Sequence, residues 1–228
     1  MSRRIEPIRA VVCDLDGTLI DTEGVFAEAA RRLLADRGKQ LDRDFMATIQ
    51  GTPGRDALPR FRDRFELSDS IEVLAADYKR HFIAALDGKP APLMAGTMAL
   101  LDELERLHLP RAIATSSRRE YVNAVFAPHG ILDRFTHVLT VDDVTHGKPH
   151  PEMYLLAAQR LGVPAGSMAV LEDSAAGYRA ARAAGAYCVI VPHAHTPLDQ
   201  VADADLIVNT LDDERLLKVL ADGYRLSN

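Results

Sequence analysis

The sequence predicts an α/β protein built on a parallel β-sheet, with a helical unit inserted after the first strand. Two observations lead to this prediction. Beyond residue 92, short apolar runs alternate with amphipathic helical segments, which is typical of right-handed βαβ units. Between residues 38 and 92, by contrast, the periodicity is helical and no segment is convincing as a strand. We therefore expect helices to cover both faces of the sheet and a separate helical unit between its first two strands.

The first expected element is a strand over residues 8–14. Its apolar run is interrupted only by Arg9 and ends in two aspartates and a glycine, as a buried parallel strand does at a reactive edge. Residues 22–37 follow with apolar side chains at helical spacing, and Gly38 is a suitable C-terminal stop. Amphipathic segments separated by breaks that contain glycine and proline then predict three more helices: 45–50, 55–65 and 70–86.

The second part of the chain alternates between extended and helical patterns. Pro151 favours the start of a helix, because its missing N–H group costs nothing in the first turn. The expected strands are 111–115, 136–141, 168–171, 187–191 and 206–208. The expected helices are 96–107, 119–127, 151–161, 175–184 and 212–220.

The composition is that of an ordinary globular protein. Of the 228 residues, 47% are hydrophobic and 26% are charged, which provides an adequate core without disulfides. The net charge of -6 does not favour a nucleic acid or an anionic membrane as partner. Cys13 and Cys188 lie in expected strands, so we interpret them as core residues. Neither a signal peptide nor a membrane-spanning window is evident, and we expect a cytoplasmic monomer.

Polar residues lie at or just beyond the ends of four of the expected strands, and Lys148 among them follows its strand after a loop. They are Asp14 and Asp16, Thr115 to Ser117, Lys148, and Glu172 with Asp173. Because the carboxyl ends of parallel strands meet at one edge of a sheet, we expect these side chains to converge.

The charged residues of this set suit phosphoryl chemistry. A carboxylate such as Asp14 can attack phosphorus, and Asp16 can protonate a leaving oxygen and later activate water. Lys148 can neutralise charge on the resulting adduct. Glu172 and Asp173 would repel the first two carboxylates unless a cation joined them, and Mg²⁺ fits because it takes few carboxylates.

The uncharged residues of the set suit phosphate oxygens. Thr115 and Ser116 offer hydroxyl and N–H groups at a strand end that opens a helix, and Gly17 permits a sharp turn toward a phosphate. Each segment also has a plainer structural explanation. The first is a possible Asp-Gly turn, the second and fourth are possible helix caps, and Lys148 is a possible surface lysine.

Taken together, the four segments resemble the signature motifs of the haloacid dehalogenase superfamily of hydrolases, subfamily I, which has an α-helical cap. The matching segments are Asp14-Leu15-Asp16-Gly17-Thr18-Leu19, Ala114-Thr115-Ser116-Ser117, Gly147-Lys148-Pro149 and Leu171-Glu172-Asp173-Ser174. The resemblance covers essentially the whole chain. It implies a Rossmann-like core made of residues 1–19 and 93–228, and a helical cap made of residues 20–92.

The resemblance also implies a role for each site residue. Asp14 would be the nucleophile, Asp16 the general acid and base, and Lys148 the residue that stabilises charge. Mg²⁺ would be held by a carboxylate oxygen of Asp14, the backbone carbonyl of Asp16 and Asp173, with Glu172 beside them or as a further ligand. Gly17, Thr115, Ser116 and Arg118 would bind the substrate.

The motifs are more similar to those of sugar-phosphate phosphatases and β-phosphoglucomutase than to those of phosphoglycolate phosphatase. We therefore expect a Mg²⁺-dependent phosphatase of a small phosphorylated metabolite, a sugar phosphate, that acts through an aspartyl-phosphate. Two alternatives stay open. One is a phosphomutase of the β-phosphoglucomutase kind, and the other is a non-catalytic protein that binds a phosphorylated ligand. Residues 51–58 resemble the cap segment that faces the substrate in this group.

Overall fold

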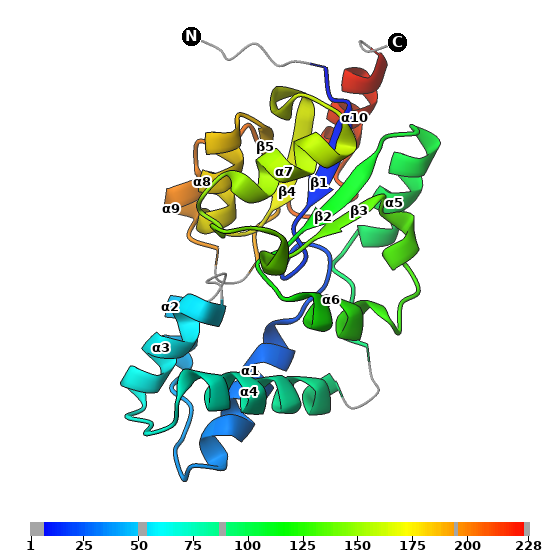
Figure 1. Cartoon of the computed structure of the whole chain (residues 1–228). Helices are drawn as coiled ribbons and strands as arrows, with labels where there is room; N and C mark the ends of the chain where they lie inside the picture. Colours follow the sequence, from blue (N-terminus) through cyan, green and yellow to red (C-terminus); the bar gives the residue numbers. More distant parts are fainter. Residues whose placement is uncertain (1–6, 50–53, 87–89, 194–195, 226–228) are drawn as a thin grey trace.

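The structure, a computed structural model, describes residues 7–49, 54–86, 90–193 and 196–225. Six parallel strands form one sheet in the order β3-β2-β1-β4-β5-β6 (Figure 1). The strands are β1 (Ala10–Cys13), β2 (Arg111–Ala114), β3 (His137–Leu139), β4 (Met168–Glu172), β5 (Tyr187–Ile190) and β6 (Leu206–Ile207). The predicted α/β class with a Rossmann-like parallel sheet is confirmed.

The first strand lies in the middle of the sheet, paired in parallel with β2 on one side and β4 on the other. Its side chains alternate between two hydrophobic cores. Val11 and Cys13 belong to the core on one face, and Ala10 and Val12 belong to the core on the other. Because both faces are covered, the sequence of β1 is an uninterrupted apolar run.

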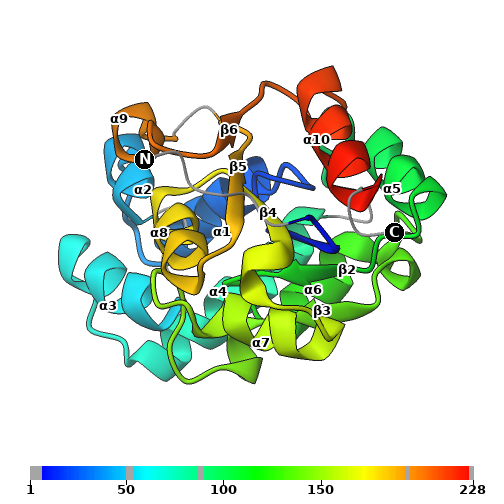
Figure 2. The same ribbon diagram turned by 90° about the horizontal axis from the view of Figure 1, so that it is seen from above.

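Two groups of helices cover the sheet (Figure 2). One face is covered by α5 (Thr97–Arg106), α6 (Arg119–Phe126) and α10 (Glu214–Arg225). The other is covered by α7 (Glu152–Leu161), α8 (Ala175–Ala184) and α9 (Leu198–Val201). This arrangement leaves the carboxyl ends of the strands facing the remaining helices (Figure 1).

The remaining helices form a unit below the sheet in Figure 1. They are α1 (Glu23–Ala35), α2 (Arg43–Ile49), α3 (Gly54–Arg64) and α4 (Ile71–Leu86). Their apolar sides enclose a third hydrophobic cluster, in which Leu33 and Phe61 are buried. Arg37 links the segments around it through ion pairs of 2.8 Å to both Asp69 and Asp77. The unit therefore has its own core beside the carboxyl edge of the sheet.

Two C-terminal elements differ from the prediction. The helix α9 was not expected, because a single turn gives no periodic pattern. The helix α10 spans 214–225 instead of 212–220, and it continues through Gly223. A Cβ atom on Gly223 would lie 2.9 Å from the backbone nitrogen of Ile8, so glycine here allows close helix packing.

Two expected segments extend beyond the residues that the structure describes. Residue 50 of the expected helix 45–50 and residues 51–53 of the segment 51–58 lie outside the described residues. Among the helices in the described part of the chain, none is long and apolar enough to cross a membrane.

Candidate active site

Asp14 is the first residue after β1 and lies in a buried ion pair. Its backbone N–H donates to the carbonyl of Leu171 at 2.9 Å, so the chain stays aligned with β4 for one more residue. Its Oδ1 accepts a hydrogen bond from Lys148 Nζ at 2.5 Å, and the same ammonium donates to the carbonyl of Ala114 at 2.9 Å. The side chains of Lys148 and Asp14 are only 3% and 9% exposed. A fixed positive charge thus stands against Asp14 at the carboxyl edge of the sheet.

Glu172 ends β4 and is held on both of its carboxylate oxygens. Oε1 accepts hydrogen bonds from Lys148 Nζ and Tyr154 Oη, each at 2.5 Å. Oε2 accepts hydrogen bonds from the backbone N–H and the hydroxyl of Ser174, at 3.3 and 3.0 Å. A Cβ atom on Gly177 would lie 1.8 Å from Oε1, so only glycine at this position of α8 leaves room for the carboxylate. Glu172 is therefore oriented by groups from three separate segments, namely the loop at Lys148, helix α7 and the residue that precedes α8.

Three carboxylates share this space with one ammonium group. Oxygen atoms of Asp14, Glu172 and Asp173 lie within 4.8 Å of one another. Burial and the neighbouring carboxylates raise the pKa of Asp14 and that of Asp173 well above the usual range, although Lys148 acts in the opposite direction. Burial alone would lower the pKa of Lys148, but Asp14 and Glu172 outweigh it and raise that pKa. The excess of negative charge favours a bound cation.

The chemistry of this group fits Mg²⁺, because all three ligand atoms are carboxylate oxygens. Gly17 brings the turn after β1 close to the group. Its backbone has φ 80°, a left-handed conformation, and a Cβ atom there would lie 2.4 Å from Asp173 Oδ2. The turn that contains Asp16 can therefore approach Asp173 only with glycine at position 17.

The side chain of Asp16 is held by three hydroxyl groups. Its Oδ1 accepts a hydrogen bond from Thr22 Oγ1 at 2.7 Å. Its Oδ2 accepts hydrogen bonds from Thr115 Oγ1 at 3.1 Å and from Ser117 Oγ at 2.7 Å. Thr115 and Ser117 follow β2, whereas Thr22 directly precedes α1. This carboxylate is thus oriented separately from the other three, among hydroxyl groups that can donate or accept a hydrogen bond.

Two buried hydroxyl groups have no hydrogen-bond partner among the described residues, namely those of Thr18 and Ser116. Such unsatisfied groups cost about 1–3 kcal/mol, a cost that a ligand able to supply the missing partner would remove.

Arg118 lies differently from the other predicted site residues. Its side chain is 62% exposed, and its guanidinium lies 3.9 Å from a carboxylate oxygen of Asp142. The structure therefore places Arg118 at the surface of this edge rather than in the buried cluster.

Two residues that contact the site carboxylates, Thr22 and Tyr154, were not predicted from the sequence. Thr22 follows the first motif, but its contact with Asp16 depends on the turn between them. Tyr154 lies on α7 among apolar residues, where a buried aromatic side chain normally indicates core packing. The pKa of Tyr154 is raised well above its usual value by burial, Glu172 and Asp14, so its hydroxyl remains a donor.

Comparison of the whole chain with protein families agrees with this geometry. The family described as haloacid dehalogenase-like hydrolase matches residues 8–185, a range that contains all of β1 to β4 and every residue of the cluster. The chain belongs to this hydrolase family. The resemblance inferred from the motifs is thereby confirmed, and the hydrolase is an enzyme of subfamily I.

Relatives of this hydrolase include named phosphatases. Validoxylamine A 7'-phosphate phosphatase of Streptomyces hygroscopicus subsp. limoneus is 33% identical, covering 91% of this chain and 96% of that protein. Fructose-1-phosphate phosphatase YqaB of Escherichia coli (strain K12) is 32% identical, covering 79% and 94%. The crystal structure of CbbY from Rhodobacter sphaeroides in complex with phosphate has a TM-score of 0.83 and 28% identity, covering 90% and 96%.

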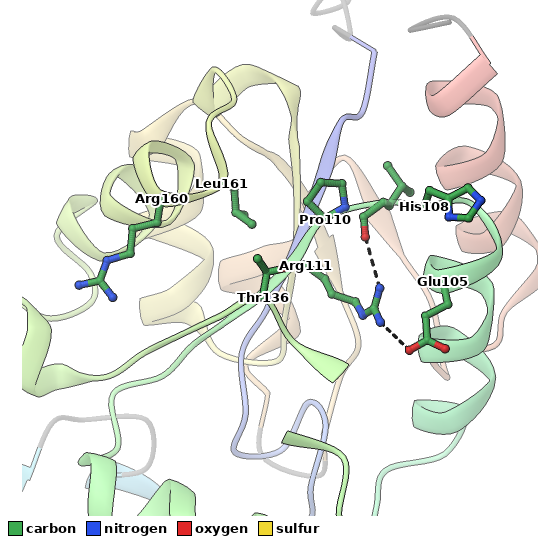
Figure 3. Close-up of a pocket in the computed structure, with 8 residues that line it drawn as sticks. Glu105, His108, Pro110, Arg111, Thr136, Arg160 and Leu161 are labelled. Carbon is green, nitrogen blue, oxygen red and sulfur yellow. Dashed lines mark hydrogen bonds and ion pairs between the residues drawn. The ribbon is translucent and has the colours of Figure 1, made fainter. Parts of the chain in front are cut away.

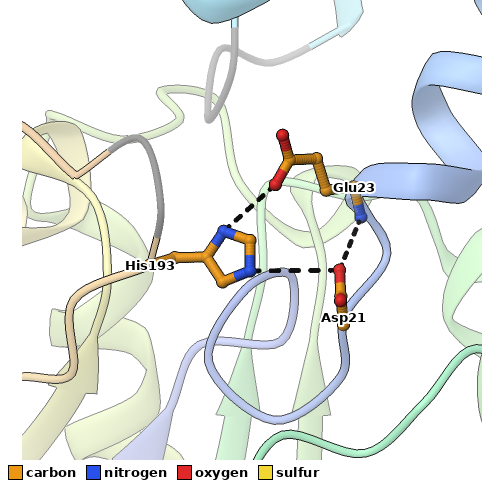
Figure 4. Close-up of side chains that lie close together, drawn as sticks. All are labelled: Asp21, Glu23 and His193. Carbon is orange, nitrogen blue, oxygen red and sulfur yellow. Dashed lines mark hydrogen bonds and ion pairs between the residues drawn. The ribbon is translucent and has the colours of Figure 1, made fainter. Parts of the chain in front are cut away.

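A second group of ionisable side chains lies where the chain enters the helical unit (Figure 4). His193, after β5, places Nδ1 3.2 Å from Glu23 Oε2 and Nε2 4.0 Å from Asp21 Oδ1. The backbone N–H of His193 donates to Thr196 Oγ1 at 2.8 Å, and that hydroxyl donates to the carbonyl of Asp173 at 2.6 Å. These contacts connect the start of α1 with the loop after β4.

A hollow at the other end of the sheet is remote from these groups (Figure 3). Its lining residues are Glu105, His108, Leu109, Pro110, Arg111, Thr136, Arg160 and Leu161. Arg111 begins β2, Thr136 precedes β3, and Arg111 donates to Glu105 at 2.5 Å. The hollow thus lies at the amino ends of the strands, on the edge opposite Asp14.

Proposed function

We propose that this hydrolase is a Mg²⁺-dependent phosphatase of a small phosphorylated metabolite of the sugar-phosphate class. The buried ion pair between Asp14 and Lys148 carries the proposal, because it sets a nucleophilic carboxylate beside a fixed positive charge. The named phosphatases among the relatives support the reaction type, and their phosphorylated substrates support the substrate class. We further propose a cytoplasmic monomer that requires no nucleic-acid or membrane partner.

In the first step, Asp14 attacks phosphorus. A bond forms between its carboxylate oxygen and phosphorus while the bond from phosphorus to the leaving oxygen breaks, which gives an aspartyl-phosphate. Asp16, in its protonated form, gives its proton to the leaving oxygen. The ammonium of Lys148 stabilises the negative charge that gathers beside Asp14.

In the second step, Asp16 takes a proton from a water molecule whose oxygen attacks phosphorus. The bond between phosphorus and Asp14 then breaks, and inorganic phosphate is released. The hydroxyl groups of Thr22, Thr115 and Ser117 keep the Asp16 side chain in place in both steps, since they can accept or donate a hydrogen bond as its protonation changes.

Asp14, Asp173 and the backbone carbonyl of Asp16 would hold Mg²⁺, with Glu172 beside them or as a further ligand. When bound, the ion supplies positive charge that offsets the charges of the carboxylates and of the phosphate. The fit rests on the three clustered carboxylates and on the close approach that Gly17 permits.

The phosphate group would be bound by the turn at Gly17 and by Thr115 and Ser116. The unsatisfied hydroxyl of Ser116 supports this assignment, because a phosphate oxygen would supply the missing partner. Arg118, at the exposed rim, would contact the part of the substrate that is not transferred.

We also propose that residues 20–92 form a cap and that the core comprises residues 1–19 and 93–228. The position of α1 to α4 beside the carboxyl edge supports this division (Figure 1). An ion pair between Lys79 of α4 and Glu120 of α6 joins the two parts. A cap of this kind would limit the access of bulk water to the phosphoryl group.

The test is phosphate release from a panel of sugar phosphates, nucleoside monophosphates and short phosphorylated acids, with Mg²⁺ and with excess EDTA. We expect release from at least one sugar phosphate, only with Mg²⁺ present. Asp14→Asn should lower kcat by about three orders of magnitude or more, because the amide is a poor nucleophile. No release from any member of the panel would contradict the proposal.

The same panel separates the alternatives. A phosphomutase would convert β-glucose 1-phosphate to the 6-phosphate in the presence of a bisphosphate primer, with little phosphate released. A non-catalytic protein would bind a phosphorylated ligand without turning it over, and Asp14→Asn would then leave the affinity for this ligand nearly unchanged.

A further inference from the structure

Tyr154 belongs to the buried ion network, although neither the sequence motifs nor the proposed reaction uses it. Its side chain is fully buried on α7, and its hydroxyl donates to Glu172 Oε1 at 2.5 Å. The same oxygen accepts a hydrogen bond from Lys148 Nζ. The centroid of the tyrosine ring lies 5.2 Å from that ammonium nitrogen. Tyr154 therefore contacts both partners of the Lys148–Glu172 pair.

The ammonium of Lys148 is shared between two carboxylates. Its acceptors are Asp14 Oδ1, Glu172 Oε1 and the carbonyl of Ala114, which matches the three hydrogens that an ammonium can donate. Asp14 and Glu172 thus compete for one positive charge. A stronger interaction of Lys148 with Glu172 would weaken its interaction with Asp14.

The other donors to Glu172 bear on this competition. Tyr154 donates to Oε1, and Ser174 donates to Oε2 from its hydroxyl and its backbone N–H. Hydrogen bonds to a carboxylate stabilise its negative charge, so a carboxylate with more donors depends less on a neighbouring cation. Because these donors stabilise the charge of Glu172, its attraction for Lys148 is weaker, and the ammonium can interact more strongly with Asp14.

We propose that Tyr154 is a positioning residue for Lys148. By hydrogen bonding to Glu172, its hydroxyl limits the attraction of Glu172 for Lys148 and keeps the ammonium at Asp14, where the phosphoryl group is transferred. This inference rests on the proposed phosphatase function. Because the hydroxyl contacts Glu172 rather than Asp14, its effect on the reaction passes through Glu172 and Lys148.

The substitution Tyr154→Phe removes the hydroxyl and keeps the ring beside Lys148. We expect kcat to fall about tenfold, because Glu172 without this hydrogen bond attracts Lys148 more strongly and the ammonium then stabilises the charge beside Asp14 less well. KM should change by less than about twofold, since the hydroxyl does not contact the substrate. Tyr187→Phe is the matched control, because Tyr187 is a buried tyrosine at the amino end of β5, and its kinetic constants should equal those of the wild type.

A double-mutant cycle with Glu172→Gln tests whether the effect passes through Glu172. If it does, Tyr154→Phe should change kcat by less than about twofold when Glu172 is already replaced. Incorporation of 4-aminophenylalanine at position 154, which restores a donor on the same ring, should recover most of the lost kcat. A residue that only fills space would not show this rescue.

The outcomes distinguish this inference from the proposed function. The kinetic constants are measured on the sugar phosphate that the wild type hydrolyses best. A wild-type protein without turnover would contradict the proposed function and this inference together. An active wild type with an equally active Tyr154→Phe variant would overturn the inference alone. Equal losses of kcat with and without Glu172→Gln would also overturn it, whatever the melting temperatures of the variants.

Discussion

The hydroxyl of Thr22 donates a hydrogen bond to Asp16 across 2.7 Å. Thr22 is buried and directly precedes α1, so the chain that enters the helical unit also orients the side chain proposed to carry the proton. A movement of α1 relative to the sheet would therefore alter the position of Asp16. We therefore expect the position of the proposed cap and the proposed proton transfer to be coupled through this contact.

Thr22→Val tests the coupling. The substitution keeps the shape of the side chain and removes the donor, so we expect kcat to fall about fivefold while KM changes little. Thr22→Ser, which keeps the hydroxyl, should retain most of the activity. Thr136→Val, at the exposed amino end of β3, is the control and should behave as the wild type. Equal kcat for the valine variant and the wild type would show that Thr22 does not orient Asp16.

Lys148→Met removes the ammonium that Asp14 and Glu172 share. Loss of one partner of a buried ion pair leaves uncompensated charge and typically costs about 3–5 kcal/mol. We expect the free energy of unfolding, measured by urea denaturation in buffer without Mg²⁺, to fall by about this amount. Phosphate release should be lost as well.

The double variant Lys148→Met/Glu172→Gln tests the cause of this instability. Removing the charge of Glu172 lowers the electrostatic imbalance, so part of the lost unfolding free energy should return while the enzyme stays inactive. A double variant less stable than Lys148→Met would show that unbalanced charge is not the source of the loss.

Gly17→Ala tests the close approach of the first turn to the proposed metal ligands. The new Cβ would lie 2.4 Å from Asp173 Oδ2, and the left-handed backbone at φ 80° costs a further 1–2 kcal/mol or so for a residue other than glycine. We expect half-maximal activity to require more Mg²⁺ and kcat to fall.

Gly24→Ala is the control for Gly17→Ala. Nothing lies within 4 Å of a Cβ atom at Gly24, which is in α1, so alanine should stabilise the helix by up to about 1 kcal/mol. Its dependence on Mg²⁺ should equal that of the wild type. An unchanged requirement for Mg²⁺ in Gly17→Ala would argue against a metal at Asp173.

Cys13 provides a test of burial next to Asp14. Burial raises the pKa of this thiol to about 12, and the charge of Asp14 adds to the effect. Because a raised pKa disfavours the thiolate in the folded state, stability is fully present below the usual thiol pKa of 9.0 and is lost as the pH rises toward 12. Cys13→Ala should therefore reduce the fall in melting temperature between those two pH values. Equal falls in the melting temperatures of the wild type and Cys13→Ala would show that the buried thiol of Cys13 does not cause the loss of stability.

The sequence predicted the sheet well because its strands are buried on both faces. The apolar run that ends at Asp14 indicated a buried parallel strand, and its abrupt polar end indicated the reactive edge of the sheet. The extent of α10 could not be predicted, because the contact of Gly223 with Ile8 joins residues far apart in the sequence. The division of the chain into core and cap remains a prediction.

The candidate site was predictable where a motif placed a charged residue directly at a strand end or, for Lys148, in the loop that follows a strand. The structure brings Asp14, Lys148, Glu172 and Asp173 together, whereas their roles remain predictions. Thr22 and Tyr154 could not be identified, because their hydroxyl contacts depend on three-dimensional packing that leaves no periodic signal. For the same reason, the sequence could not place Arg118 at the rim.

The central position of β1 has a consequence for how the protein folds. Both neighbours of β1 come from later parts of the chain, and the whole helical unit separates it from β2. Pairings between distant segments form late, because closing a long loop costs entropy before any contact compensates for it. The helical unit, whose contacts are closer in sequence, can acquire structure before the sheet is complete. We therefore expect the edge that carries Asp14 to be among the last parts of the molecule to form during folding, which phase-resolved hydrogen exchange during refolding would test.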